Sequence, residues 1–189
     1  MKFFKKALPF LIAAFAVLFD QITKWIAVVQ LKPIGSVPII RNIFHFTYTT
    51  NPGAAFSLFS AENQRWIFMV VSSVAILIML GFLFLDKSSG SLFRAAMGAV
   101  LGGGIGNMID RLGLGTLMRG GDIAEKGATE VVDFLDFCLI NFPIFNIADC
   151  FVCVGAGLLF LAFFLDWRKE VLSAREKETA EAQDEDLRS

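Results

Sequence analysis

The sequence predicts an all-α membrane protein in which four transmembrane helices carry a small β-cradle at the outer membrane face. Hydrophobic residues make up 56% of the 189-residue chain and charged residues only 19%, whereas a soluble domain has about 25% charged residues. The mean hydropathy is +0.64. This composition excludes a soluble enzyme and a disordered chain. With 17 basic and 18 acidic residues the net charge is -1, so no basic field is available to hold nucleic-acid phosphates.

Four apolar segments are long enough, with their flanks, to cross a bilayer, which takes about 20 helical residues. They are residues 7–31, 66–85, 95–109 and 147–165. The basic N-terminus followed by an apolar run resembles a secretory signal, and Ala14-Phe15-Ala16 fits its cleavage pattern. Because the apolar run continues beyond this site, we interpret it as an uncleaved first span.

The distribution of Lys and Arg predicts that both termini are cytoplasmic. Segments 1–6, 86–94 and 166–189 are short and hold three, two and five basic residues, while the longer segments 32–65 and 110–146 hold three each. Cytoplasmic loops are the ones enriched in Lys and Arg. We therefore expect a membrane domain at 1–167 and a polar cytoplasmic tail at 168–189, to which no chemistry is assigned.

The first outer segment has the two-residue period of a β-strand. Between residues 39 and 50, Phe44, Phe46 and Tyr48 fall on one side, and His45 falls on the other. The turn Asn51-Pro52-Gly53 ends this pattern. The sequence thus predicts a small sheet, the β-cradle, at about 36–60, with His45 as a strand-face residue and not a metal ligand.

Glycines in the third span recur at Gly98, Gly102 and Gly106. Small residues four apart form a flat stripe that lets a second helix approach closely. We interpret this stripe as a packing surface.

The cysteines and the single histidine indicate neither a disulfide framework nor a metal site. Cys138, Cys150 and Cys153 are odd in number, and His45 is the only histidine. No metal and no cofactor are expected.

Ionisable residues inside spans are costly, so each is a candidate for function. Asp20 and Lys24 are four apart and can pair on one helix face, either to neutralise each other or to anchor a polar site. Asn107, Asp110 and Arg111 end the third span. They either cap and anchor that helix or orient a ligand or a catalytic group, and an arginine fork suits a substrate carbonyl or phosphate.

Two aspartates flank the loop before the fourth span. Asp133 lies in an apolar stretch, and Asp149 follows Asn146, which could cap the helix with Asp149 as its local partner. The loop with Pro143 could instead fold back and bring the two carboxylates together. Such a pair shares a proton and can activate water while protonating a carbonyl, which is aspartic-protease chemistry. Asp136 is an alternative partner for Asp133.

Five sequence blocks occur in an order that resembles signal peptidase II, the bacterial lipoprotein signal peptidase. They are Asp20 to Lys24, Asn51 to Phe56, Gly106 to Arg111, Val132 to Phe134 and Phe145 to Asp149. The resemblance covers residues 7–165, and its specificity comes from all five blocks occurring together.

This resemblance implies a four-helix aspartic endopeptidase of the bacterial inner membrane, with a periplasmic β-cradle and a periplasmic active site. The substrate would be a prolipoprotein, cut just before its diacylglyceryl-modified lipobox cysteine. Asp133 and Asp149 would be the catalytic pair, which of them is acid and which is base remaining open. The implied supporting residues are Asp20, Lys24, Asn51, Gly53, Asn107, Asp110, Arg111 and Asn146. A monomer in contact with membrane lipid is expected, with globomycin-type inhibitors bound between the aspartates.

Residues 112–130 depart from the family pattern, which joins the same blocks by a shorter loop. Their glycines and charges predict a mobile outer loop that gates the site, contacts a partner or is inert. Asp122, Glu125, Glu130 and Asp136 are interpreted as solvated or structural acids.

Two functions other than this protease are considered. A non-enzymatic transporter or packing subunit would place its polar residues along a pathway and would not require Asp133 and Asp149 to be close. An intramembrane protease with a Gly-x-Gly-Asp motif would need an aspartate where this chain has Ile105.

Overall fold

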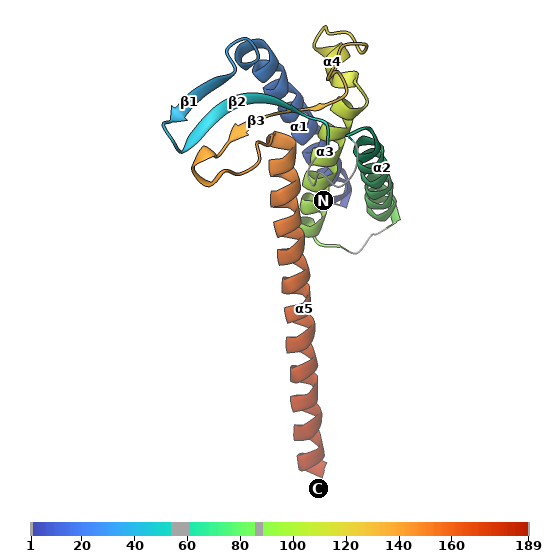
Figure 1. Cartoon of the computed structure of the whole chain (residues 1–189). Helices are drawn as coiled ribbons and strands as arrows, with labels where there is room; N and C mark the ends of the chain where they lie inside the picture. Colours follow the sequence, from blue (N-terminus) through green and yellow to red (C-terminus); the bar gives the residue numbers. More distant parts are fainter. Residues whose placement is uncertain (1, 54–60, 86–88, 189) are drawn as a thin grey trace.

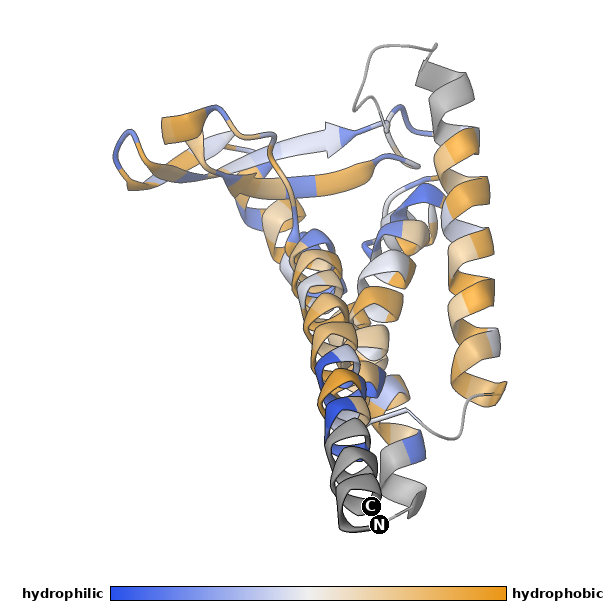
Figure 2. Ribbon diagram, turned by 90° about the horizontal axis from the view of Figure 1, so that it is seen from below, coloured by the Kyte–Doolittle hydropathy of each residue, from blue (hydrophilic) through white to orange (hydrophobic). Residues whose placement is uncertain are grey.

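A computed structural model describes residues 2–53, 61–85 and 89–188, and within them four helices are long and apolar enough to cross a membrane. Figures 1 and 2 show these helices side by side, with a small sheet across one end. The predicted fold class is therefore confirmed. Residues 54–60 of the predicted cradle, including Ala54 to Phe56, and residues 86–88 of a predicted inner loop lie outside the described residues. The spans are Lys6–Leu31, Trp66–Leu85, Ser91–Arg111 and Ile147–Lys177.

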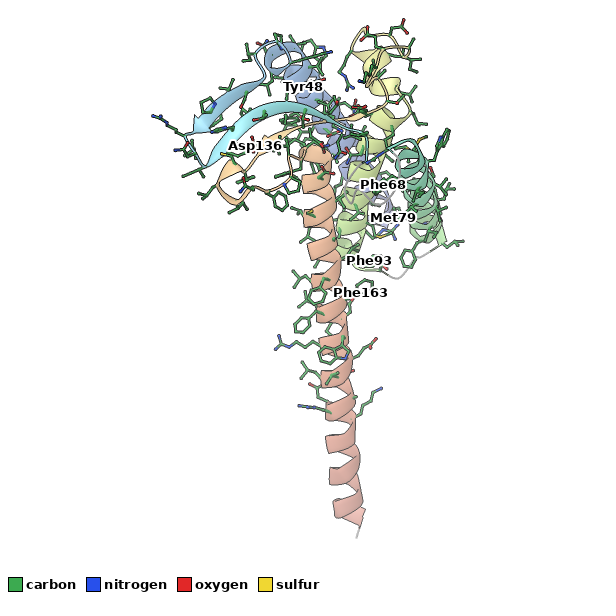
Figure 3. All side chains as sticks on the ribbon, viewed as in Figure 1. Tyr48, Phe68, Met79, Phe93, Asp136 and Phe163 are labelled. Carbon is green, nitrogen blue, oxygen red and sulfur yellow. The ribbon has the colours of Figure 1, made fainter. Side chains whose placement is uncertain are left out.

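The helices are arranged around α3 (Ser91–Arg111), which packs against α1 (Lys2–Ile26) and α5 (Ile147–Arg188). Helix α1 continues into η1 (Ala27–Leu31), a turn of π-helix, and α2 (Ala61–Leu85) stands to one side next to α3. Phe93 of α3 and Phe163 of α5 meet edge to face, with ring centroids 5.5 Å apart (Figure 3). Helix α5 extends well beyond the predicted end at residue 165. Its tail is rich in Ala, Glu, Lys and Arg, which favour helix, and contains neither glycine nor proline.

The glycine stripe of α3 faces α1, as predicted. A Cβ added at Gly102 would lie 2.6 Å from the Ala16 Cβ, and one at Gly98 would lie 2.8 Å from the Pro9 Cα. Carbon atoms do not approach this closely without displacement. At Gly106 the same atom would lie 2.7 Å from an oxygen of Asp20. The stripe therefore brings the polar residues of α1 against α3.

Gly102→Ala is expected to lower the free energy of unfolding by about 1–3 kcal/mol, because overpacking displaces side chains and backbone. Gly157→Ala is the matched control, since a Cβ there meets nothing within 4 Å. Alanine favours helix over glycine by roughly 1 kcal/mol, so this control should be neutral or slightly stabilising. Thermal unfolding of both variants in detergent measures the difference. Equal melting temperatures would show that α1 and α3 are not in tight contact.

The sheet is antiparallel, and in the described part of the chain its order is β1 (Ser36–Ile40), β2 (Phe44–Asn51) and β3 (Val131–Asp136). The pattern at residues 39–50 was interpreted as one strand, but a turn at residues 41–43 divides it. Asn42 has a φ of 61°, which asparagine tolerates better than most residues. The third strand was not predicted, because the short stretch around Asp133 lacks a clear two-residue alternation.

The aromatic side of β2 packs against the end of α1. Phe46 and Tyr48 contact a buried cluster formed by Ala27, Val132 and Phe134. This cluster joins η1 to two strands and so fixes the sheet across the helix ends.

Residues 112–130 fold against β2 and the end of α3. They include a short helix, α4 (Leu114–Met118), and the Thr116 hydroxyl donates to the Ala128 carbonyl at 2.7 Å. The Thr50 hydroxyl donates to Glu130 at 2.6 Å, so Glu130 is a structural acid, while Asp122 and Glu125 are exposed. The mobility expected for this segment stays a prediction.

Candidate active site

Asp133 and Asp149 come from different elements, β3 and the first turn of α5, and meet through Asn146. The Asn146 side-chain amide donates to Asp133 Oδ1 at 2.6 Å, and its backbone N–H donates to Asp149 Oδ2 at 3.2 Å. Asp133 is buried and Asp149 half-buried. One residue thus holds both carboxyl groups in a single site.

The first turn of α5 positions Asp149 by a reciprocal cap. The Asp149 N–H donates to Asn146 Oδ1 at 3.0 Å while the Asn146 N–H donates back to the Asp149 carboxylate. This is a capping box, with Asn146 as the N-cap. Asp149 is therefore the local partner of the N-cap residue, as one interpretation of the sequence predicted. This role is compatible with a pair formed with Asp133, because Asp149 Oδ1 takes no part in the cap and accepts from the Asn107 amide at 2.7 Å.

The environment of Asp133 raises its pKa from 3.8 to about 7. Burial is the largest cause because it disfavours the charged form, and the neighbouring Asp149 is the second. Hydrogen bonds from Asn51 and Asn146, and the charge of Lys24, act in the opposite direction. This carboxyl can therefore hold a proton near neutral pH.

The orientation of Asn107 is set by Lys24. The Lys24 ammonium donates to Asn107 Oδ1 at 2.9 Å, and Asn146 donates to the same oxygen at 3.0 Å. A lysine ammonium can only donate, so it requires the oxygen of the Asn107 amide and turns the NH₂ group toward Asp149. The Lys24 ammonium and the Asn146 amide together therefore determine which group Asn107 offers to the aspartate.

A cluster of buried charges lies behind the two aspartates. Lys24 pairs with Asp20 and with Asp110 at 2.9 Å each, and all three side chains are fully buried. The predicted pair of Asp20 and Lys24 is present, and it also anchors the site. Asp20 accepts the Ala148 N–H at 3.0 Å and Asp110 accepts the Val132 N–H at 3.3 Å. Each carboxylate therefore holds the backbone just before one of the site aspartates.

The remaining predicted residues border the site toward α2. Asn51 Oδ1 accepts the Gly53 N–H at 2.8 Å, and Gly53 has a φ of 96° with the Phe68 ring 3.0 Å from where a Cβ would lie. Glycine is therefore needed here for both conformation and space. The Arg111 guanidinium lies 5.8 Å from the centroid of the Phe68 ring and interacts electrostatically with both site aspartates. Phe68 is labelled on α2 in Figure 3.

Asp136 belongs to a different part of the sheet. Asp136 is labelled at the sheet in Figure 3, and its carboxylate accepts the Thr47 hydroxyl at 2.7 Å. It pairs across the strands with His45, which is a strand-face residue as predicted. The hydrogen bonds described for Asp133 do not involve Asp136. The alternative pair of Asp133 with Asp136 therefore has no support from the geometry.

Sequence reasoning missed two residues of this network. Gln21 donates to Asp20 at 3.1 Å and to the Gly106 carbonyl at 3.1 Å, and Arg119 pairs with Asp110 at 3.0 Å. The place of Gln21 inside a charged block was an available signal. Arg119 had none, because it lies in the segment where the chain departs from the family pattern. Among the described residues, no group of His, Cys, Asp or Glu is arranged to hold a metal ion.

Comparison with known proteins gives consistent results. The family described as Signal peptidase (SPase) II matches residues 12–165. A lipoprotein signal peptidase of Brevibacillus brevis is 40% identical over 161 residues, 85% of this chain and 97% of the relative. One of Nostoc sp. is 45% identical over 157 residues, 81% and 87% of the two chains. A solved bacterial membrane enzyme matches with a TM-score of 0.66 and 32% identity, over 82% of this chain and 91% of its own.

Proposed function

Because the chain belongs to the signal peptidase II family, we propose that it removes the signal peptide from prolipoproteins with Asp133 and Asp149 as an aspartic catalytic pair. Family membership, as expected from the sequence blocks, makes the chain a peptidase and a multi-pass bacterial membrane protein. The proposal of a catalytic pair rests on one observation: Asn146 donates hydrogen bonds to both carboxyl groups, and Asp133 is buried with a raised pKa.

In the proposed mechanism the protonated carboxyl is Asp133 and the base is Asp149. Asp149 takes a proton from water as the water oxygen bonds to the carbonyl carbon of the residue before the lipobox cysteine. Asp133 donates its proton to the carbonyl oxygen, which lowers the charge of the tetrahedral intermediate. The C–N bond then breaks, Asp149 returns its proton to the cysteine nitrogen, and the intermediate's hydroxyl returns its proton to Asp133. The products are a signal peptide with a new carboxyl terminus and a lipoprotein with a free cysteine amine.

The proposed substrate is membrane-anchored by a diacylglyceryl group on that cysteine. Strand β3 and the first turn of α5, which carry the aspartates, lie where the sheet meets the ends of the membrane-spanning helices (Figures 1 and 2), so a substrate embedded by its acyl chains would need to reach only the membrane surface. With both termini cytoplasmic, this end is periplasmic. Arg111 and Asn51 are suited to hold the peptide carbonyls, and globomycin-type inhibitors would occupy the space between the aspartates. The proposed enzyme acts as a monomer.

Cleavage of a synthetic peptide with a diacylglyceryl-cysteine lipobox tests this proposal. The purified full chain in detergent should cut the lipidated peptide before the cysteine and leave the same peptide without lipid uncut. Mass spectrometry of the products identifies the bond. If the folded protein cuts neither peptide, the transporter or packing-subunit function becomes the better one. If it cuts both equally, the substrate class is wrong.

The rate of this cleavage should fall as the pH rises above about 7. The pKa of Asp133 is raised from 3.8 to about 7, so its proton is present below that pH and is lost above it. Loss of an essential acid of the free enzyme lowers kcat/KM about tenfold for each pH unit beyond the pKa. We expect this decline in kcat/KM measured between pH 6 and 9, with melting temperature recorded at each pH as a control. A constant kcat/KM over this range would show that no proton on Asp133 is required.

A further inference from the structure

We propose that Arg119, which comes from the segment at residues 112–130, is a positioning residue for the catalytic pair. Arg119 pairs with Asp110 and so fixes its carboxylate, which in turn binds Lys24 and the backbone of the strand that carries Asp133. This inference rests on the proposed function and extends it, because it gives the segment a part in catalysis. The segment is then neither an inert insertion nor only a gate.

The side chain of Arg119 is directed inward, although the residue lies on an outer segment. Its guanidinium donates to Asp110 Oδ1 at 3.0 Å and more weakly to Gln21 Oε1 at 3.4 Å. Only 7% of the side chain is exposed, and Asp110 is fully buried. A long cation that reaches into a closed site and pairs there at short distance is not a solvated surface charge.

The backbone of the segment is shaped for this contact. Gly113, with a φ of 74°, turns the chain out of α3 and starts α4, and Arg119 ends α4 one turn later. Gly115 lies against the pair itself: a Cβ there would overlap Asp110 Oδ1 and lie 2.8 and 2.9 Å from the two terminal nitrogens of Arg119. Two glycines thus allow the approach that the ion pair needs, one by conformation and one by lack of a side chain.

The contact with Arg119 uses one oxygen of Asp110 and leaves the other for the catalytic site. Asp110 Oδ2 accepts the Lys24 ammonium at 2.9 Å and the Val132 N–H at 3.3 Å. Val132 precedes Asp133 in β3, and Lys24 orients Asn107, which donates to Asp149. Arg119 is therefore linked through Asp110 to each of the two catalytic aspartates by a short series of hydrogen bonds and ion pairs.

Charge balance gives a second, independent reason. Asp20 and Asp110 are acidic and Lys24 and Arg119 basic, so the formal charges of the four side chains, which ion pairs link in the order Asp20, Lys24, Asp110 and Arg119, sum to zero. Without Arg119 the cluster carries two carboxylates on one ammonium. Buried carboxylates compete strongly for a single cation, so Lys24 would be drawn toward them and away from Asn107. The Asn107 amide would then lose the constraint that directs its NH₂ group toward Asp149.

The test is the kinetics of Arg119→Met on the lipidated peptide, with Lys126→Met as the matched control. Lys126 lies in the same segment but is exposed, so its replacement removes the same charge without touching the cluster. A displacement of about 1 Å in a catalytic group costs up to roughly 100-fold in rate. We expect kcat to fall about 10- to 100-fold in Arg119→Met with KM changed less than threefold, and Lys126→Met to match the unaltered chain.

Recovery of kcat in a second variant distinguishes a positioning role of Arg119 from a simple loss of the folded structure. Arg119→Lys keeps the charge but not the fork that donates to both Asp110 and Gln21, so it should recover part of the kcat that Arg119→Met loses. Rates are referred to folded protein, measured by size exclusion and melting temperature. If Arg119→Met does not fold, Arg119→Gln provides the same comparison with a shorter neutral donor.

Several outcomes would overturn the inference. These are an unchanged kcat in the neutral variant, a change in KM alone, no recovery in Arg119→Lys, or an equal loss in Lys126→Met. None of them affects the proposed function as long as the unaltered chain cuts the lipidated peptide. Failure of the unaltered chain to cut would instead contradict the proposed function itself.

Discussion

Asp133→Asn and Asp149→Asn should each reduce kcat for the lipidated peptide by about 10²- to 10⁴-fold, which is the scale of a lost general acid or base. Asparagine has nearly the shape of aspartate and can keep a hydrogen bond to Asn146 or Asn107, but it can neither take nor give the proton. The effect is therefore on kcat, with the fold preserved. Because Asp133 is a buried carboxyl of raised pKa, its replacement by a neutral amide should not lower the melting temperature.

Asp136→Asn is the control for both variants. Its carboxylate lies three residues from Asp133 but accepts the Thr47 hydroxyl on the sheet. Asparagine keeps an acceptor oxygen for this bond, so kcat should stay within about threefold of the unaltered chain, the low end of the effect of one hydrogen bond. Normal cleavage by Asp149→Asn would disprove the pair. If Asp136→Asn were the inactive variant instead, the pairing of Asp133 with Asp136 would have to be reconsidered.

Lys24→Met should destabilise the protein by about 3–5 kcal/mol, the usual result of removing one partner from a buried charge pair. Lys24 is the common partner of Asp20 and Asp110, and all three are fully buried. Its loss leaves two carboxylates without the ammonium that both contact, in a place that water does not reach. Thermal or denaturant unfolding in detergent measures the loss, and cleavage should fall as well because Asn107 is no longer oriented.

Lys169→Met gives the matched measurement at the surface. Lys169 pairs with Asp166 at 3.2 Å on the same kind of helix, but the side chains are 78% and 65% exposed. Such pairs contribute about 0–1 kcal/mol, so the melting temperature should hardly change. Combining Lys24→Met with Asp110→Asn should restore part of the lost stability, since one unpaired charge is removed. If Lys24→Met and Lys169→Met unfold alike, the buried cluster does not stabilise the fold.

Much of the architecture follows from local patterns in the chain. The uncharged run before residue 85 identifies α2, and the spacing of Gly98, Gly102 and Gly106 identifies the face of α3 that meets a neighbour. The spacing of Asp20 and Lys24 identifies a buried pair. Each of these features depends on residues within a single helix, so regular helix geometry is enough to predict them.

The strands show the limit of such local reasoning. The turn at Asn42 and the strand at residues 131–136 escaped prediction, because a short strand is stabilised by its neighbours more than by its own composition. Strand β3 exists because β2, which lies 80 to 91 positions earlier in the chain, pairs with it. That pairing, and not any pattern around Asp133, places this aspartate beside the first turn of α5.

The sequence by itself determined the membrane class, the four spans, the packing stripe of α3 and, through its five blocks, the family and the candidate residues of the site. Only the tertiary structure decided how those residues are connected. Lys24 reaches Asn107 across 83 positions of chain, and Asp20 reaches the backbone at Ala148 across 128. Contacts of this length depend on how closely α1, α3 and α5 pack, and residue spacing carries no information about them. Arg119 is the clearest case: the ion pair it forms with Asp110 depends on how the chain turns at Gly113 and passes at Gly115.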